Sequence, residues 1–170
     1  FGGGTPTTEM AELVETIRLV GDFFRVWEIS VETNHRDLRL EILGPLRAAG
    51  VTRLSVGVQS FDDRRLREME RYEKYGSGAE AADHLRRAAG IFPTLNVDLI
   101  FNLPHQDLAS LERDLEIFHS LGANQVSFYP LMTAPTATRR MSRTMGLPDP
   151  RRRRQFYETI LARLQPDFTP

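Results

Sequence analysis

The sequence predicts an α/β fold in which parallel strands form a wide, TIM-like barrel that is incomplete at the N-terminus. Helical and strand patterns alternate along the chain, and Gly50, Gly90 and Gly122 each end a helical pattern a few residues before a strand. Such consecutive βα units require a parallel sheet with right-handed crossovers. Each predicted strand also has one apolar and one polar face, which favours a barrel with a polar interior.

The first half of the chain contains three helical patterns and two strand patterns. Met10, Leu13 and Ile17 recur at helical spacing, and Thr7 or Thr8 is placed to cap that helix. The expected elements are a helix over residues 10–20, a strand over 26–32, a helix over 37–49, a strand over 53–59, and a helix from a Ser60 cap to residue 70.

The second half of the chain carries clearer helix-start signals. Ser77 and Glu80 have the spacing of a capping box, Asp107 is a good N-cap, and Pro150 suits the first helical position. The expected elements are a helix over residues 77–90, a strand over 95–101, a helix over 107–122, a strand over 125–129, a loop over 134–147 and a helix over 149–164.

The polarity of the two strand faces distinguishes a doubly wound sheet from a barrel. Helices cover both faces of a doubly wound sheet, so its strands are apolar throughout. Polar groups inside a barrel cost roughly 1–3 kcal/mol each when they are unsatisfied, so water or a polar ligand must occupy the interior. The alternative is an open sheet with one solvated face. The residues expected on the polar face are Glu28, Ser30, Glu32, Ser55, Gly57, Gln59, Asn96, Asp98, Ile100, Gln125, Ser127 and Tyr129.

Composition limits the classes of partner and cofactor. The formal net charge is −1, and the arginines at 139–140 and 151–154 are interpreted as solvated surface, so a nucleic-acid partner is not expected. No apolar stretch approaches the roughly 20 residues that span a bilayer, so we expect no membrane partner and a cytoplasmic location. The chain has no cysteine and therefore offers no thiolate ligand to a metal cluster.

A glycine run opens the chain, at residues 2–4 directly after Phe1. Three successive glycines remove side chains where a ligand must touch the main chain, although a tight turn would explain them equally well. A natural protein does not normally begin at such a loop, so we interpret the sequence as a portion of a longer protein.

Polar side chains also mark the C-terminal halves of three successive strands. Glu32, Gln59 and Asp98 lie there, on the face expected to be polar. Barrels of α/β units place their active sites at the C-terminal ends of the strands. Each residue alone could be a structural cap, but three on successive strands indicate a shared site.

Four motifs in this order resemble one known family. They are Phe-Gly-Gly-Gly-Thr-Pro at Phe1, Val-Glu-x-Asn at Val31, Arg-Leu-Ser-x-Gly-Val-Gln-Ser-Phe at Arg53, and Val-Asp-Leu-Ile-Phe-x-Leu-Pro at Val97. The sequence is similar to the HemN-like radical S-adenosylmethionine (SAM) proteins over residues 1–132. These residues are expected to form the barrel core, and residues 133–170 a loop and helix of the same domain or the start of the next.

The resemblance implies a partial (βα)6 barrel that binds SAM against a [4Fe–4S] cluster whose cysteine ligands lie outside this chain. The glycine run would face the methionyl ammonium with its carbonyl groups, and Arg71, assisted by Gln59, would pair with the methionyl carboxylate. Asp98 would accept hydrogen bonds from the ribose, and Glu32 would lie beside the site. The full set of cofactor-binding candidates is Gly2, Gly3, Gly4, Thr5, Glu32, Gln59, Arg71 and Asp98.

The same resemblance implies a radical SAM enzyme that reductively cleaves SAM to abstract hydrogen, in the manner of an oxygen-independent coproporphyrinogen III oxidase. A small-molecule substrate such as a tetrapyrrole and an electron donor such as flavodoxin or ferredoxin are the implied partners. A non-catalytic haem chaperone, a HemN-like methyltransferase and an unrelated TIM-barrel enzyme stay open as alternatives. His35 stands where the family usually has proline, and Asn102 and His105 where it usually has glycine. His84, His105 and His119 are interpreted as loop or helix-surface residues rather than ligands.

Overall fold

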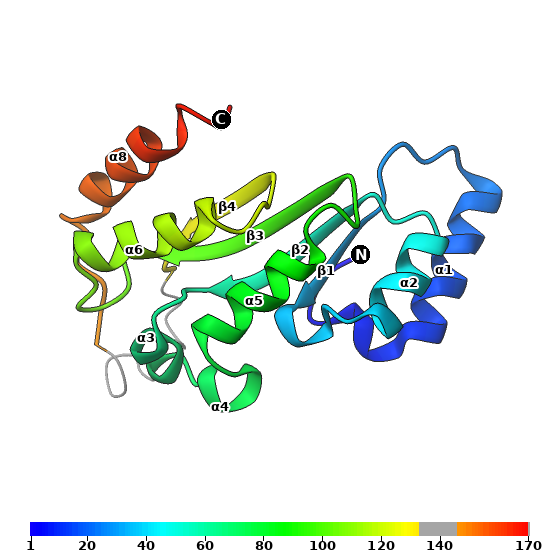
Figure 1. Ribbon diagram of the computed structural model, residues 1–170, viewed down its shortest axis with the longest axis horizontal. Coiled ribbons are helices and arrows are strands. Elements are labelled where there is room, and N and C mark those ends of the chain that lie inside the picture. The colour runs from blue at the N-terminus through cyan, green and yellow to red at the C-terminus, as the bar shows by residue number, and fades with distance from the viewer. Residues whose placement is uncertain (133–145, 170) are drawn as a thin grey trace.

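The computed structural model describes residues 1–132 and 146–169. Four parallel strands form one sheet in the order β1-β2-β3-β4 (Figure 1). The strands are β1 (Ser30–Asn34), β2 (Arg53–Gln59), β3 (Thr94–Phe101) and β4 (Gln125–Pro130). The helices are the 3-10 turns η1 (Pro6–Glu9) and η2 (His35–Asp37), and α1 (Met10–Phe23), α2 (Leu40–Ala48), α3 (Asp63–Glu68), α4 (Tyr72–Tyr75), α5 (Gly78–Ala88), α6 (Leu108–His119) and α8 (Arg153–Leu164).

The apolar face of the sheet forms the core, as the strand pattern predicted. Alternate residues of β2 and β3 are buried against apolar side chains of α1, α2, α5 and α6 in one continuous cluster. The principal members are Leu13, Ile17, Val31, Leu43, Leu46, Leu54, Val56, Val58, Leu85, Leu95, Val97, Leu99 and Phe118. The opposite face carries the polar residues, so the α/β architecture and its division into two faces are confirmed.

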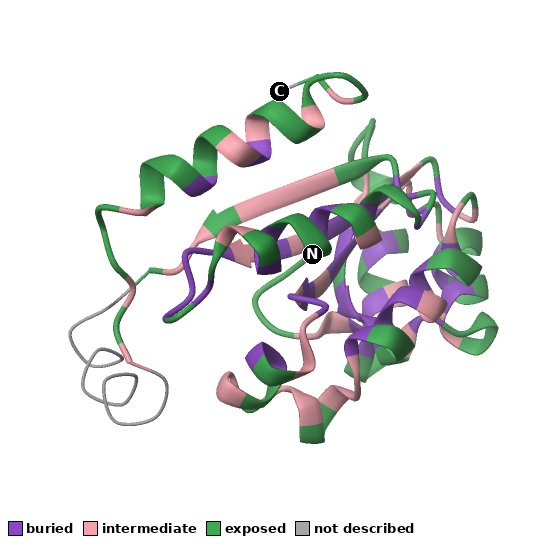
Figure 2. Cartoon of the chain, turned by 60° about the vertical axis from the view of Figure 1, so that its left-hand side comes forward, coloured by how far each residue is buried: buried purple, intermediate pink, exposed green. Residues whose placement is uncertain are grey.

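A smaller cluster attaches α8 to α6. Phe156 and Ile160 of α8 pack on Leu111 and Leu115 of α6 and on Phe101 of β3. The remainder of α8 is mostly exposed, and β4 is less buried than β2 and β3 (Figure 2).

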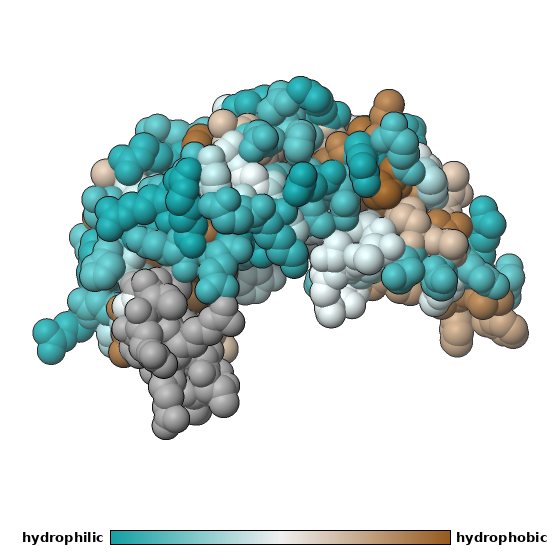
Figure 3. All heavy atoms as spheres, turned by 90° about the horizontal axis from the view of Figure 1, so that it is seen from below, coloured by the Kyte–Doolittle hydropathy of each residue, from teal (hydrophilic) through white to brown (hydrophobic). Residues whose placement is uncertain are grey.

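Between its two ends the molecule is arched and hollowed, as expected for part of a barrel wall rather than a flat sheet (Figure 3).

Several predicted boundaries were wrong by a few residues. The first strand begins at Ser30, because its partner β2 begins at the paired residue Arg53, and residues 26–28 are exposed outside the sheet. Glu28 is therefore not on the polar face. The helix expected from residue 37 begins at Leu40, after η2, and the last helix begins at Arg153 rather than at residue 149. Almost all of the loop expected over 134–147 lies outside the described residues.

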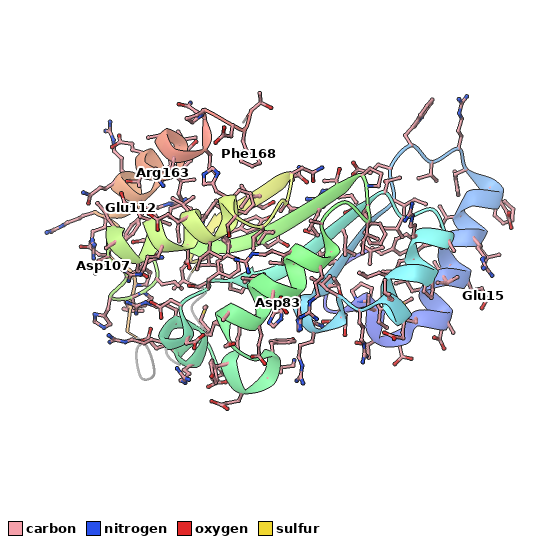
Figure 4. All side chains as sticks on the ribbon, in the orientation of Figure 1. Glu15, Asp83, Asp107, Glu112, Arg163 and Phe168 are labelled. Carbon is pink, nitrogen blue, oxygen red and sulfur yellow. The ribbon has the colours of Figure 1, made fainter. Side chains whose placement is uncertain are left out.

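Two of the predicted caps are confirmed. Ser77 and Glu80 form both hydrogen bonds of the capping box. The Asp107 side chain accepts a hydrogen bond from the backbone N–H of Ser110 at the start of α6 (Figure 4). These polar groups satisfy backbone donors that the first helical turn leaves free.

The other two predicted caps were wrong, because the Thr7 hydroxyl binds the half-buried Asp37 and the Ser60 hydroxyl binds the buried Asp114 instead. Thr7 donates to Asp37 at 2.6 Å and does not cap a helix. Ser60 donates to Asp114 at 2.9 Å, and the cap of α3 is Asp62.

Within the described residues, no helix is both long and apolar enough to cross a bilayer.

Candidate functional site

A cavity of about 390 Å³ lies on the polar face of the sheet. Its walls come from the end of the glycine run, from β1, β2 and β3, from α4, and from Tyr129 of β4. The residues that line it are Gly4, Thr5, Glu32, Thr33, Asn34, Arg53, Ser55, Gly57, Gln59, Arg71, Tyr75, Asp98 and Tyr129. Most of the predicted site residues therefore come together in one place.

Strand register brings the polar side chains into rows across the sheet. Glu32 is paired with Ser55, and Ser55 with Asn96. In the next row toward the C-terminal ends of the strands, Gly57 is paired with Asp98. Residues paired in this way share a face, and residues two apart along a strand do so as well. Register and spacing together therefore place these groups on one surface.

The carboxylate of Asp98 is held in a fixed orientation. Its Oδ2 accepts a hydrogen bond from the Ser55 hydroxyl at 2.8 Å, and its Oδ1 accepts one from the Asn96 side-chain amide at 2.8 Å. Asn96 is fully buried; its amide also donates to Ser55 Oγ at 2.8 Å, and its oxygen accepts from Ser127 at 3.1 Å. Asp98 is half-buried, so its carboxylate can still accept bonds from a ligand diol.

The glycine run is anchored to the end of β1 by Glu32. The backbone N–H of Gly3 donates to Glu32 Oε2 at 3.2 Å, and a Cβ on Gly2 would lie 2.6 Å from the Glu32 carboxyl carbon. Gly2 and Gly3 do not line the cavity, whereas Gly4 and Thr5 do. The run therefore contributes backbone to the rim, and a side chain at Gly2 would displace the Glu32 carboxylate.

A β-bulge at the end of β2 redirects the chain beside the cavity. The register with β3 shifts between Gly57 and Gln59, and Gln59 has a φ of 78°, which is uncommon for a residue with a side chain. Arg71 reaches back to this bulge, where its Nη2 donates to the Gly57 carbonyl at 2.9 Å. Burial lowers the pKa of Arg71. Among the described residues no carboxylate lies within salt-bridge distance of this guanidinium.

Behind Arg71 lies a buried histidine that sequence reasoning did not single out as a core residue. His35 is 3% exposed, and its Nδ1 is 3.5 Å from Nδ1 of His84. Burial, followed by the charges of His84 and Arg71, lowers the pKa of His35 to about 4. His35 is therefore neutral at neutral pH. The described residues include no group of three or more side chains arranged to hold a metal ion.

The sequence interpretation missed four of the cavity residues, Thr33, Asn34, Arg53 and Tyr75. Arg53 lies at the start of β2, where its guanidinium donates to Gln125 at 2.7 Å and to Ser30 at 2.8 Å. Its spacing of two from Ser55 would have placed it on the polar face. Asn34 also shares its face with Glu32, whereas Thr33 lies between them on β1. Tyr75 lies on the short helix α4, which has no separate signal in the sequence.

Two positions in the loop after β3 explain a departure from the family pattern. Asn102 and His105 both have positive φ, at 59° and 57°. These are conformations that glycine adopts without cost, and asparagine and histidine are enriched among the other residues that adopt them. His105 is exposed in the loop, His119 is exposed on a helix and His84 is half-buried on a helix, as expected.

Comparison with known proteins agrees with this arrangement. A family model described as the radical SAM superfamily matches residues 1–118. The haem chaperone HemW of Bacillus subtilis is 32% identical over 97% of this chain and 45% of the relative. The oxygen-independent coproporphyrinogen III oxidase of Escherichia coli is 31% identical over 95% of this chain and 36% of the relative.

Solved structures have the same fold. The coproporphyrinogen III oxidase HemN of Escherichia coli, described as a radical SAM enzyme, superposes with a TM-score of 0.80 at 30% identity over 97% of this chain and 39% of that one. Elp3 of Methanocaldococcus infernus, at 15% identity and a TM-score of 0.69 over 92% of this chain and 37% of that one, shares the fold alone. This similarity confirms the expected partial barrel. The chain spans less than half the length of these relatives, and it belongs to the radical SAM superfamily, in the group of HemN and HemW.

Proposed function

We propose that the cavity binds SAM and that the whole protein is a radical SAM enzyme of the coproporphyrinogen oxidase type. The observation that carries this proposal is that one cavity contains both a guanidinium and a carboxylate that are free to bind the two ends of SAM. Arg71 has no carboxylate partner among the described residues, and the Asp98 carboxylate is already oriented by Ser55 and Asn96. A guanidinium binds a carboxylate with strong, charge-assisted hydrogen bonds, and a carboxylate accepts bonds from a diol.

The remaining groups of SAM also have suitable partners. The methionyl ammonium needs acceptors, which the carbonyl groups of the glycine run and the exposed Glu32 carboxylate can supply. A volume of about 390 Å³ lies within the range of roughly 300–1,000 Å³ that is usual for small-molecule sites. Thr5 and Gln59 line the same cavity and would contact the ligand from the rim and from the bulge.

The chain's residues do not provide a site for the iron–sulfur cluster. The sequence has no cysteine, so thiolate ligands for a [4Fe–4S] cluster would come from outside this chain. Such a cluster supplies the electron for reductive cleavage of SAM. The part of this chain is to bind and orient SAM, with Arg71 at the carboxylate and Asp98 at the ribose. A tetrapyrrole substrate and a flavodoxin or ferredoxin donor belong to the same proposal.

One observation favours a second candidate, a haem chaperone of the same family. HemW of Bacillus subtilis matches 97% of the chain at 32% identity, a similarity close to that of the Escherichia coli oxidase, which matches 95% at 31%. A chaperone of this kind would retain the barrel and handle haem rather than convert a porphyrinogen. The two candidates share the SAM cavity and differ in what the rest of the protein accepts.

The deciding experiment uses the full-length protein, reconstituted anaerobically with iron and sulfide. With a reductant and SAM, we expect 5′-deoxyadenosine, measured by chromatography, and its loss in Asp98→Ala. With coproporphyrinogen III present, we expect decarboxylated product. Haem binding without any decarboxylated product would support the chaperone instead. The absence of SAM binding in the reconstituted protein would contradict both candidates.

A further inference from the structure

The guanidinium of Arg71 is held from two sides. Its central carbon lies 4.5 Å from the centroid of the Tyr75 ring, and its Nη2 donates to the Gly57 carbonyl at 2.9 Å. Tyr75 itself lines the cavity. An aromatic face attracts a guanidinium at this distance, and the attraction is stronger where water is partly excluded. Stacking and one carbonyl bond thus fix a cation that has no carboxylate partner among the described residues.

The helix α4 sets this geometry. Arg71 is the residue that precedes α4, Tyr75 is its last residue, and the Tyr75 N–H donates to the Arg71 carbonyl at 2.8 Å. Residues four apart on a helix lie on the same side, so the ring comes directly against the guanidinium. Gly76, with a φ of 100°, ends the helix at once. A helix of one turn therefore places the aromatic ring and the arginine together at the cavity wall.

We propose that Tyr75 is a positioning residue that stacks on Arg71 and holds its remaining N–H groups toward the cavity, where they bind a carboxylate in a planar, two-point contact. This inference rests on the proposed binding of SAM, whose methionyl carboxylate would be the anion. A guanidinium has five N–H donors in one plane, so control of the ring plane decides which of them face the ligand. Without the ring, the same arginine would retain its charge but lose its orientation.

The chain contains a matched control for this contact. Arg67 lies over the ring of Tyr72 at 3.7 Å, and Tyr72 is half-buried like Tyr75. The two tyrosines begin and end the same short helix, but neither Tyr72 nor Arg67 lines the cavity. Tyr72→Leu removes a stacking pair of the same kind next to the site, whereas Tyr75→Leu removes the pair at the site.

The test measures the affinity of the reconstituted full-length protein for SAM and for decarboxylated SAM, which lacks only the carboxylate. We expect Tyr75→Leu to bind SAM about tenfold more weakly, the order of effect of a partly buried cation–π pair. The same variant should bind decarboxylated SAM like the wild-type protein. Tyr75→Phe, which retains the ring, should recover most of the lost affinity, and Tyr72→Leu should bind both ligands normally.

Three results would overturn the inference. Wild-type affinity in Tyr75→Leu would show that the ring does not position Arg71. Equal losses for SAM and decarboxylated SAM would indicate a general loosening of the cavity instead. A Tyr75→Phe variant as weak as Tyr75→Leu would show that the hydroxyl acts and the ring does not. Failure of the wild-type protein to bind SAM would instead contradict the proposed function, so the two failures are distinguishable.

Discussion

A buried carboxylate outside the site provides a quantitative prediction about stability. Asp114 of α6 is 2% exposed and accepts hydrogen bonds from the Ser60 hydroxyl at 2.9 Å and from the Phe61 N–H at 2.8 Å. Burial, only partly opposed by these two bonds, raises the pKa of Asp114 from 3.8 to about 6. The ionised form is therefore disfavoured in the folded protein.

The sign and size of the effect follow from proton linkage. Between pH 3.8 and about 6 the folded protein binds more protons at Asp114 than the unfolded chain does. The contribution of Asp114 to stability is thus fully present below pH 3.8 and is lost as the pH rises through about 6. The loss at neutral pH amounts to about 3 kcal/mol. Asn in place of Asp114 cannot ionise and avoids this loss.

His35 changes stability in the opposite direction over the same range. Its pKa in the folded protein is about 4, below the ordinary value of 6.5, so its contribution is present above pH 6.5 and is lost as the pH falls through about 4. The two effects largely cancel in the wild-type protein. The informative quantity is therefore the difference between the wild-type protein and Asp114→Asn, from which His35 drops out.

The assay is urea-induced unfolding followed by circular dichroism at several pH values from 4 to 8. The free energy of unfolding of Asp114→Asn, relative to wild type, should rise by about 2.5 kcal/mol from pH 4 to pH 8. A relative stability that does not change with pH would refute the argument. A fall toward neutral pH would refute it as well, because that slope would require an Asp114 pKa below its ordinary value.

Further substitutions test other parts of the structure. Gly78→Ala would place a Cβ 1.9 Å from the carbonyl oxygen of Phe61, so the free energy of unfolding should fall by about 3 kcal/mol. Gly21→Ala, which meets nothing within 4 Å in α1, should raise the free energy of unfolding by about 0.5–1 kcal/mol, and equal effects of the two substitutions in thermal denaturation would contradict the packing. Ser77→Ala removes the capping box and should cost about 1 kcal/mol in the same assay; no change would show that the cap contributes nothing. Asn96→Ala leaves the Asp98 carboxylate without one donor and should weaken SAM binding several-fold in equilibrium dialysis, whereas unchanged affinity would argue against this support.

The sequence allowed the two faces of the sheet to be predicted because strand periodicity is local. Alternation along β2 and β3 puts Ser55 and Asp98 on the face opposite the core, and parallel register then brings them together. The glycine run and Glu32 were also recognised as neighbours of this site. These inferences needed only the period of a strand and the order of the motifs.

The parts that could not be predicted depend on contacts distant in sequence or on short elements. The stacking of Tyr75 on Arg71 needs a single-turn helix, which leaves no periodic pattern. The contact of the buried His35 with the half-buried His84 joins residues far apart in the chain, and Ser60, a predicted cap, instead binds Asp114 on a distant helix. Patterns of neighbouring residues do not reveal contacts of this kind, because the partner lies elsewhere in the chain.

The central claim is that Arg71 receives the carboxylate of SAM in this cavity. Isothermal titration of SAM into the reconstituted full-length protein tests it most directly, with Arg71→Ala compared against Arg67→Ala, which removes an arginine outside the cavity. We predict wild-type affinity for Arg67→Ala and a loss of about ten- to a hundredfold for Arg71→Ala, the usual effect of losing charge-assisted hydrogen bonds. Equal affinity of the two variants for SAM would contradict the account.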